Sequence, residues 1–345
     1  MATDAWPRST WPQLTDVLAA RRAIAPYLRP TPVVTSPALD QVLGCRAYVK
    51  CENVNPTRAF KVRGGLNLIS KLNDDERRRG VIAASTGNHG QSVAYAAQLF
   101  GVRAIIGVPQ GANPVKLQAM RDLGAQVIEV GRDFDDAREW VERTAAAEGY
   151  RYVHSGNEPL LIAGVGTISL ELIEEIPDLE VIIVPIGGGS GACGHLITAK
   201  AINPRIELIG VQATGAPAVT HSWRERRWMT TDAIRTKAEG LTTRAPFALT
   251  LAMLWEGLDE IVLVTDEEME EGIRILIETT RQVAEHAGAA AVAAARRLRD
   301  RVAGRKVGLI LSGGNITMDA LRTILSNPDD RGRATNAVHE RSGDR

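Results

Sequence analysis

The chain has few cysteines, no excess charge of either sign and no long hydrophobic run. Its three cysteines, Cys45, Cys51 and Cys193, form no Cys-x-x-Cys pair, which argues against a disulfide framework and a thiolate metal site. Lys plus Arg and Asp plus Glu both number 41, so the net charge is zero and no nucleic-acid partner is expected. There is no apolar run of about 18 residues and no basic leader before an apolar stretch. We therefore expect neither membrane insertion nor export, and a cytoplasmic location.

The chain is long enough to form one large domain or two modest ones, with 345 residues of which 44% are hydrophobic. Strand and helix patterns alternate along most of it with short loops between them. This alternation predicts an α/β fold with parallel-rich sheets flanked by helices. The expected strands are 47–51, 81–85, 103–108, 126–130, 150–153, 181–186, 207–211, 261–264 and 307–311, and the expected helices are 11–27, 89–100, 114–123, 134–148, 158–176, 193–201, 267–284 and 290–302.

The strands fall into two groups, so we predict two lobes. The large lobe takes 1–65 plus 156–326, the small lobe takes 66–155, and the polar tail 327–345 is expected to be disordered. The segment 212–243 is less regular and interrupts the alternation. Ligands of open parallel sheets bind beyond the carboxyl ends of the strands. We therefore expect an active site in a cleft between the lobes, lined by loops that follow strands.

Lys61 lies in the stretch AFKVRGG, which follows a predicted strand and opens a helix. A lysine directly behind Phe60 can be held in an apolar pocket, where its pKa falls toward neutrality and its amine condenses readily with aldehydes. The same stretch taken alone also fits an ordinary lysine on a solvated face. The heptapeptide leaves both interpretations open.

Gly187 to Gly191 follow an apolar strand and precede a helix, with Ser190 as the only side chain. Backbone N–H groups at a helix N-terminus bind anions, phosphate above all. Gly189, Gly191 and Gly194 also match G-x-G-x-x-G, the dinucleotide pattern. The acidic residue expected about 20 residues later in that pattern is missing. Phosphate binding is therefore favoured, while a nicotinamide or flavin site and a purely structural turn stay open.

Two further loops follow strands. Ser85, Thr86, Gly87, Asn88 and His89 offer hydroxyls, an amide and helix N–H groups that suit a substrate carboxylate. An ordinary helix cap is the alternative, and a metal role for His89 lacks ligand partners at a suitable spacing. The loop that begins at Ser312 places a hydroxyl where it can face a ring nitrogen, although by itself it also fits a helix cap.

In this order, the segments AFKVRGG, STGNHGQ, HSGNEP with AGVGT, GGGSG, EHAGAAAVAA and SGGN resemble the serine/threonine dehydratase and serine racemase family of pyridoxal-phosphate enzymes. The matching segments span 55–315, which is most of the chain. The resemblance implies fold type II, also called the tryptophan synthase β-like fold, with pyridoxal 5′-phosphate as the cofactor. It also implies an amino-acid substrate and a homodimer or higher homo-oligomer.

The resemblance assigns roles to residues of this chain. Lys61 holds the cofactor as a Schiff base and removes the α-proton of the substrate. Phe60 borders the cofactor ring, Asn88 binds its 3′-oxygen, and Ser312 faces its pyridine nitrogen. The phosphate is cradled by Gly187, Gly188, Gly189, Ser190 and Gly191. Glu285 matches an acid near the ring, although it also fits a solvated helix residue.

The implied reaction is α,β-elimination from a β-hydroxy amino acid, L-threonine or L-serine, to a 2-oxo acid and ammonia. The β-hydroxyl leaves with a proton from the cofactor phosphate, and the released aminoacrylate hydrolyses. Enzymes of β-replacement usually carry Lys-Asp-Arg where this chain has Lys61-Val62-Arg63, which disfavours that activity. Racemases of the family place a serine where this chain has Thr86, which keeps a hydroxyl and is a candidate catalytic residue for racemisation. A cofactor-binding sensor without turnover is a remote alternative.

Two departures from the family pattern carry expectations. Arg58-Ala59 stands where relatives often have Gly-Ser, and a cation there raises 3-hydroxyaspartate as an alternative substrate, unless Arg58 points to solvent. The divalent-metal site of relatives begins with a glutamate and adds an aspartate, where this chain has Gln212 and Ala218. We therefore expect no bound metal.

Overall fold

The computed structural model describes residues 6–326, so the predicted disorder of 327–345 lies outside the described residues. The strands form a six-stranded sheet in the order β1-β2-β10-β7-β8-β9 and a four-stranded sheet in the order β5-β4-β3-β6. Among the strands of residues 6–326, only β1 runs antiparallel to its neighbour. The strands are β1 Val33–Val34, β2 Arg46–Cys51, β3 Val81–Ala84, β4 Ala104–Val108, β5 Gln126–Glu129, β6 Arg151–Tyr152, β7 Val181–Pro185, β8 Glu207–Ala213, β9 Glu260–Val264 and β10 Lys306–Leu311.

Helices cover both sheets, and the predicted α/β class with parallel-rich sheets is confirmed. The central strands of both sheets are buried along their length, as expected where helices pack on both faces. The helices are α1 Leu14–Ile24, α2 Pro37–Leu43, α3 Lys61–Ser70, α4 Asp74–Arg79, α5 Asn88–Leu99, α6 Pro114–Asp122, α7 Phe134–Glu148, α8 Pro159–Glu175, α9 Ser190–Ile202, α10 Ala218–Glu225, α11 Ala248–Gly257, α12 Asp266–Thr280, α13 His286–Arg297 and α14 Met318–Ser326, with short 3-10 turns at η1 Arg8–Thr10, η2 Glu52–Val54 and η3 Glu239–Leu241.

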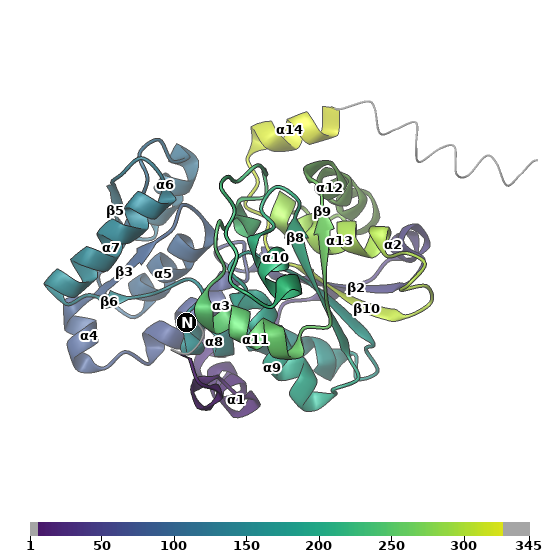
Figure 1. The fold of residues 1–345 in the computed structure, drawn as a ribbon, viewed down its shortest axis with the longest axis horizontal. Helices are drawn as coiled ribbons and strands as arrows, with labels where there is room; N and C mark the ends of the chain where they lie inside the picture. The colour runs from purple at the N-terminus through teal and green to yellow at the C-terminus, as the bar shows by residue number, and fades with distance from the viewer. Residues whose placement is uncertain (1–5, 327–345) are drawn as a thin grey trace, which may run out of the picture.

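The two sheets occupy opposite sides of the molecule. Figure 1 shows β3 to β6 with α4 to α7 on one side, the larger sheet on the other, and α3 and α8 between them. All four strands of the smaller sheet come from one continuous stretch of chain. We therefore keep 66–155 and 1–65 plus 156–326 as the proposed lobes. No helix within residues 6–326 has the length and apolar character needed to span a membrane.

The structure corrects several predicted helices. The helix expected at 267–284 ends at Thr280, because Arg281 adopts a left-handed φ of 61° and caps it. The next helix begins at His286 instead of residue 290 and ends at Arg297, so Glu285 lies in the break between the two helices. The helix expected at 193–201 already begins at Ser190. Helices α2, α4, α11 and α14 were not predicted, whereas a helix end expected at 222–228 overlaps the short α10.

Helix α3 is packed unusually closely between its neighbours. A Cβ atom at Gly64 would lie 2.4 Å from the side chain of Leu161 on α8, and one at Gly65 would lie 2.3 Å from Ser92 Oγ on α5. From the other side, a Cβ at Gly164 of α8 would lie 2.6 Å from the Arg63 carbonyl oxygen. The Gly-Gly pair of AFKVRGG therefore lets three helices approach, and Lys61 sits at the start of this packed helix.

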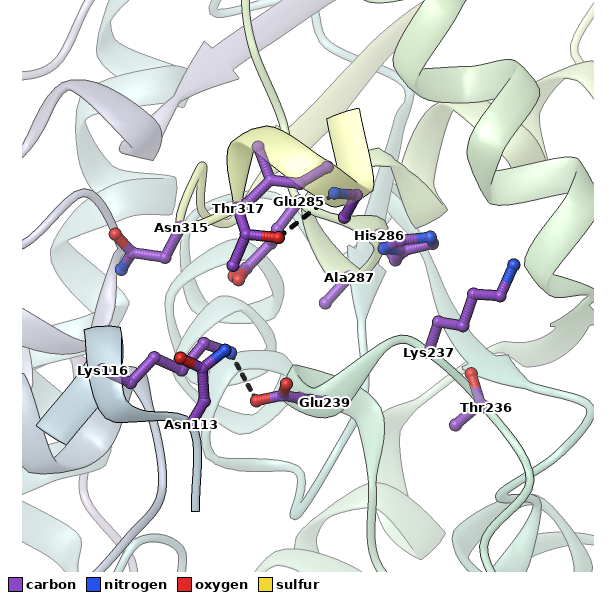
Figure 2. Close-up of a pocket in the computed structure, with 12 residues that line it drawn as sticks. Asn113, Lys116, Thr236, Lys237, Glu239, Glu285, His286, Ala287, Asn315 and Thr317 are labelled. Carbon is purple, nitrogen blue, oxygen red and sulfur yellow. Dashed lines mark hydrogen bonds and ion pairs between the residues drawn. The ribbon is translucent and has the colours of Figure 1, made fainter. Parts of the chain in front are cut away.

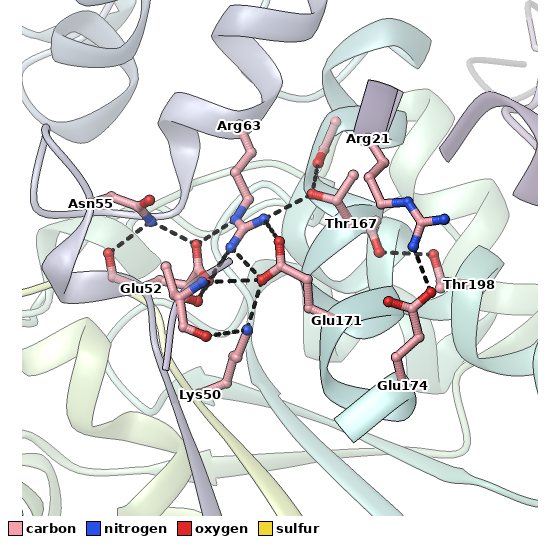
Figure 3. Close-up of polar contacts among 12 residues, drawn as sticks. Arg21, Lys50, Glu52, Asn55, Arg63, Thr167, Glu171, Glu174 and Thr198 are labelled. Carbon is pink, nitrogen blue, oxygen red and sulfur yellow. Dashed lines mark hydrogen bonds and ion pairs between the residues drawn. The ribbon is translucent and has the colours of Figure 1, made fainter. Parts of the chain in front are cut away.

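A buried charge cluster anchors the first turn of α3 to the larger sheet and to α8 (Figure 3). Arg63 donates from Nε to Glu52 Oε2 at 2.7 Å and from Nη2 to Glu171 Oε2 at 2.8 Å, and Lys50 pairs with Glu171 at 2.7 Å. Burial alone would raise the pKa of Glu52, but the charge and hydrogen bonds of Arg63 lower it overall. Two cations and two carboxylates thus satisfy one another in the interior and fix the end of α3 that carries Lys61.

Candidate active site

Lys61 is the first residue of α3, and its amine contacts Ser190 in the Gly-rich loop. Its Nζ donates to Ser190 Oγ at 2.8 Å and to the Ser155 carbonyl at 3.2 Å, and it lies 5.3 Å from the centroid of the Phe60 ring. Burial lowers the pKa of Lys61 from 10.5 to about 8. The amine is therefore not on a solvated face, and a substantial fraction of it is neutral near pH 7.5.

The loop Gly187–Gly191 follows β7 and leads into α9, where Gly189 has a left-handed φ of 91°. The first part of the loop is packed too closely for a side chain at Gly187 or Gly188. A Cβ at Gly187 would lie 2.4 Å from the Gly240 carbonyl oxygen, and one at Gly188 would lie 2.1 Å from the ring of Phe247. The first N–H groups of α9 have no carbonyl one turn earlier, so this end of the helix suits an anion.

Glu285 is buried, and its carboxylate faces Asn88, the first residue of α5. Asn88 Nδ2 donates to Glu285 Oε1 at 2.7 Å, while Asn88 Oδ1 accepts from Asn315 Nδ2 at 2.7 Å. Burial raises the pKa of Glu285, and the hydrogen bond from Asn88 opposes this shift. Glu285 is therefore not the solvated helix residue that the sequence also allowed, and the structure brings it together with Asn88.

The loop from Ser85 to His89 joins β3 to α5. Ser85 Oγ accepts from the Gly87 N–H at 3.2 Å, and a Cβ at Gly87 would meet no atom within 4 Å, so the loop borders open space. His89 is buried, donates from Nε2 to the Val153 carbonyl at 2.9 Å, and has its pKa lowered to about 3, mainly by burial. Thr86 is half-buried, and its hydroxyl has no hydrogen-bond partner among residues 6–326.

Ser312 lies at the end of β10, beside Phe60. Its carbonyl accepts from the Phe60 N–H at 3.0 Å, and its buried hydroxyl makes only a long contact of 3.4 Å to the Ala287 carbonyl. A contact of that length is weak, so the hydroxyl is available to another partner. Gly191 lies beside the same ring, since a Cβ at Gly191 would be 3.4 Å from the Phe60 ring.

A cavity of about 330 Å³ lies beside helix α6 and η3, next to Glu285 and Asn315 (Figure 2). Lys116 on α6 reaches across it to pair with Glu239 of η3. Sequence analysis did not single out Lys116, Glu239 or Asn315 for roles of their own, because no local pattern signals a partner on a distant segment of the chain. The cavity is lined by Asn113, Lys116, Thr236, Lys237, Glu239, Glu285, His286, Ala287, Asn315, Ile316, Thr317 and Ala320.

Arg58 and Gln212, the two departures from the family pattern, lie elsewhere. Arg58 is exposed, has a left-handed φ of 56°, and does not line the cavity. Gln212 is buried, and its Oε1 accepts from the N–H of Thr220 at 2.9 Å and from its hydroxyl at 2.8 Å. Ala218 is also buried. Across residues 6–326, no three His, Cys, Asp or Glu side chains gather as a metal site.

The chain was compared with known families and structures. A family model described as "Pyridoxal-phosphate dependent enzyme" matches residues 24–313. The chain belongs to this family. The predicted family and cofactor are therefore confirmed.

Three similar proteins show how close the likeness is. L-threonine ammonia-lyase of Thermotoga maritima is 41% identical over 313 residues, which cover 91% of this chain and 78% of the relative. L-threo-3-hydroxyaspartate ammonia-lyase of Saccharomyces cerevisiae is 35% identical over 319 residues, covering 92% and 98%. The crystal structure of serine racemase from Dictyostelium discoideum is 33% identical with a TM-score of 0.83, covering 89% of this chain and 99% of that one. The predicted fold type is thus confirmed as well.

The side chains around Lys61 fit pyridoxal phosphate. A lysine with a pKa of about 8 suits an aldehyde, and the loop before α9 suits a phosphate. The Ser312 hydroxyl, held only by a long contact, suits a ring nitrogen. These groups come from three separate segments of the chain, and each matches one functional group of the cofactor.

Proposed function

We propose that this pyridoxal-phosphate enzyme is an ammonia-lyase that converts a β-hydroxy amino acid, L-threonine or L-serine, to a 2-oxo acid and ammonia. The observation that carries the proposal is the half-buried amine of Lys61, bonded to Ser190 of the Gly-rich loop and with its pKa lowered to about 8. The two ammonia-lyase relatives, each matching more than nine-tenths of this chain, support this reaction class.

In this proposal the residues hold the cofactor as follows. Lys61 is its covalent anchor, Phe60 borders the ring, Asn88 donates to the ring oxygen, and Ser312 faces the ring nitrogen. Glu285 acts through Asn88, and Gly187 to Gly191 with Ser190 hold the phosphate. When bound, the cofactor supplies an electron sink for the pair left at the substrate α-carbon. A serine hydroxyl cannot protonate a pyridine nitrogen, so the sink is modest and suits elimination, in which the leaving hydroxyl takes the electrons.

Lys61 is also the proposed α-proton base. A general base works best when its pKa lies near the working pH, and burial places the pKa of Lys61 at about 8. The loop from Ser85 to His89 would hold the substrate carboxylate, since Gly87 borders open space at the start of α5. Because the pKa of His89 is lowered to about 3, this neighbour stays neutral and does not compete for the proton.

A second candidate substrate is 3-hydroxyaspartate, on which the named yeast relative acts. The cation suggested by the sequence, Arg58, is exposed, whereas Lys116 is only 13% exposed and lines the cavity beside Glu285. Its partner Glu239 is 53% exposed, so Lys116 can exchange that partner for a second substrate carboxylate. We therefore move the proposed dicarboxylate contact from Arg58 to Lys116.

Serine racemisation remains a third candidate because the named Dictyostelium discoideum structure is a serine racemase. Racemisation needs an acid or base on the ring face opposite Lys61. Thr86 offers a free hydroxyl there in this proposal, with a methyl group that a serine lacks. We expect elimination to exceed racemisation, and interconversion of L- and D-serine that outpaces ammonia release would contradict this.

One panel separates the candidates. Purified protein is incubated with L-threonine, L-serine, D-serine and both 3-hydroxyaspartates, and ammonia and 2-oxo acid are measured for each. Lys61→Ala should lose both turnover and the covalent, borohydride-reducible cofactor, and retention of either would overturn the assignment of Lys61. A cofactor spectrum without ammonia from any substrate would instead favour a sensor. A homodimer or higher homo-oligomer and a cytoplasmic location stay predictions.

A further inference from the structure

Asn315 takes part in a directed chain of hydrogen bonds that ends at the active site. Its Nδ2 donates both to the Thr57 carbonyl at 2.9 Å and to Asn88 Oδ1 at 2.7 Å. Asn88 Nδ2 in turn donates to Glu285 Oε1 at 2.7 Å. The four groups come from the loop before α3, the loop after β10, the start of α5 and the break between α12 and α13.

The first member of the chain sets the direction of the rest. A backbone carbonyl can only accept, so the nitrogen of Asn315, not its oxygen, must face Thr57. The second hydrogen on that nitrogen then meets the oxygen of Asn88. Because the oxygen of the Asn88 amide accepts from Asn315, its nitrogen faces away from Asn315 and donates to the Glu285 oxygen. The O and N positions of both amides, which are otherwise interchangeable in shape, thus satisfy the Thr57 carbonyl at one end of the chain and the Glu285 oxygen at the other.

We infer that Asn315 is a positioning residue that makes Asn88 present an N–H, and not a carbonyl oxygen, to the cofactor ring. Asn88 Nδ2 has two hydrogens and donates one of them to Glu285, so its second N–H is available to the cofactor ring. This inference rests on the proposed function only in placing the cofactor ring beside Asn88. It does not depend on which substrate is turned over.

The backbone supports the same arrangement. Arg58 holds a left-handed φ of 56° without a side-chain partner among residues 6–326. Arg226 and Arg281, the other arginines with positive φ, both cap helices, whereas Arg58 does not. The turn at Arg58 lets two successive carbonyls accept hydrogen bonds from the loop after β10. The Thr57 carbonyl accepts from Asn315, and the Arg58 carbonyl accepts from the Gly314 N–H at 2.9 Å. The strained turn therefore presents the carbonyl that orients Asn315.

A double-mutant cycle on the cofactor-loaded protein tests the inference. Asn315→Ala, Asn88→Ala and the double variant are titrated with pH while the visible absorption of the bound cofactor is followed, and the cofactor dissociation constant is measured by dialysis. Asn315→Ala should weaken cofactor binding several-fold and move the pH midpoint of the absorption band. Neither effect should appear when Asn315→Ala is added to Asn88→Ala. Additive effects in the two backgrounds would overturn the inference, because they show that Asn315 does not act through Asn88.

Two more variants sharpen the result. Asn315→Asp has only acceptors toward Thr57 and Asn88, so it should weaken binding roughly tenfold, more than Asn315→Ala does. Asn53→Ala is the matched control, because Asn53 donates to Gln282 Oε1 at 3.0 Å and to the Val283 carbonyl at 3.1 Å without contacting Asn88. It should leave the spectrum unchanged.

Unchanged spectra in both Asn315 variants of a protein that binds the cofactor would overturn the positioning role. If Asn315→Ala fails to fold, Asn315→Ser completes the same cycle. A wild-type protein without a borohydride-reducible band would overturn the proposed function itself, so the two failures are distinguishable.

Discussion

The pKa of Lys61 gives the most direct test of the site. Burial lowers it from 10.5 to about 8. At pH 7.5 an amine of pKa 10.5 is only about 0.1% neutral, whereas an amine of pKa 8 is roughly one quarter neutral. Only the neutral amine attacks an aldehyde. At this pH the cofactor-free protein should therefore capture pyridoxal phosphate about 200 times faster than it would with an unperturbed lysine.

The assay is the rate of cofactor capture by cofactor-free protein between pH 6 and 10, followed by visible absorption. Dividing by the rate for a simple alkylamine in the same buffers, expressed per neutral amine molecule from that amine's own pKa, removes the cofactor's own titration. The corrected rate should increase up to about pH 8 and then level off. Lys71→Met is the control, because Lys71 is exposed at the other end of α3, and it should not alter the profile. A rate that climbs steadily to pH 10 would refute the lowered pKa.

The same shift predicts a pH dependence of stability. A base whose pKa is lowered in the folded state binds fewer protons there than in the unfolded chain, so the free energy of unfolding increases with pH between about 8 and 10.5. After allowing for the partial exposure of Lys61, the effect is about 2 kcal/mol. Cofactor-free wild type should be less stable than Lys61→Met at pH 7, and this gap should close by pH 10.5. A gap independent of pH would contradict the burial argument.

Three other changes have expected outcomes. Arg58→Gly removes the cost of a left-handed φ of 56° and should raise the free energy of unfolding by about 0.5–1 kcal/mol in urea denaturation without altering turnover; a loss of turnover would show that Arg58 contacts substrate. Gly64→Ala places a Cβ 2.4 Å from Leu161 and should lower the free energy of unfolding by about 1–3 kcal/mol in the same urea denaturation. An unchanged free energy of unfolding would show that α3 and α8 can separate at no cost. Lys116→Met removes the cation that pairs with Glu239. It should raise KM for 3-hydroxyaspartate about tenfold in steady-state kinetics, while KM for threonine stays within twofold. Equal effects on both substrates would show that Lys116 does not bind the second carboxylate.

Much of the chemistry could be predicted from the sequence. Lys61, the Gly187–Gly191 loop and the Ser85–His89 loop each lie where a strand meets a helix, and their residue types follow from local requirements. An anchoring amine needs an apolar neighbour, a phosphate needs bare backbone N–H groups, and helix starts need polar caps. Such requirements act within a few residues, so a local pattern can reveal them, and their order along the chain indicated the family and the cofactor.

The break between α12 and α13 could not be predicted, because it contains neither glycine nor proline and is set by the conformation of Arg281. That break places Glu285 in the site. Its bond to Asn88 joins residues 197 apart in sequence, and the Asn315 bond to Asn88 joins residues 227 apart. The exposure of Arg58 and the pairing of Lys116 with Glu239 across the cavity also depend on contacts between distant segments.

The sequence by itself therefore determined which functional groups this protein carries and which cofactor they serve. Only the tertiary structure decided how those groups are oriented, which cation faces the cleft and which carboxylate is buried. The physical reason is that orientation and burial depend on atoms contributed by distant segments. The amide of Asn88 has no preferred direction until Glu285 and Asn315, which is itself bound to the Thr57 carbonyl, are brought beside it.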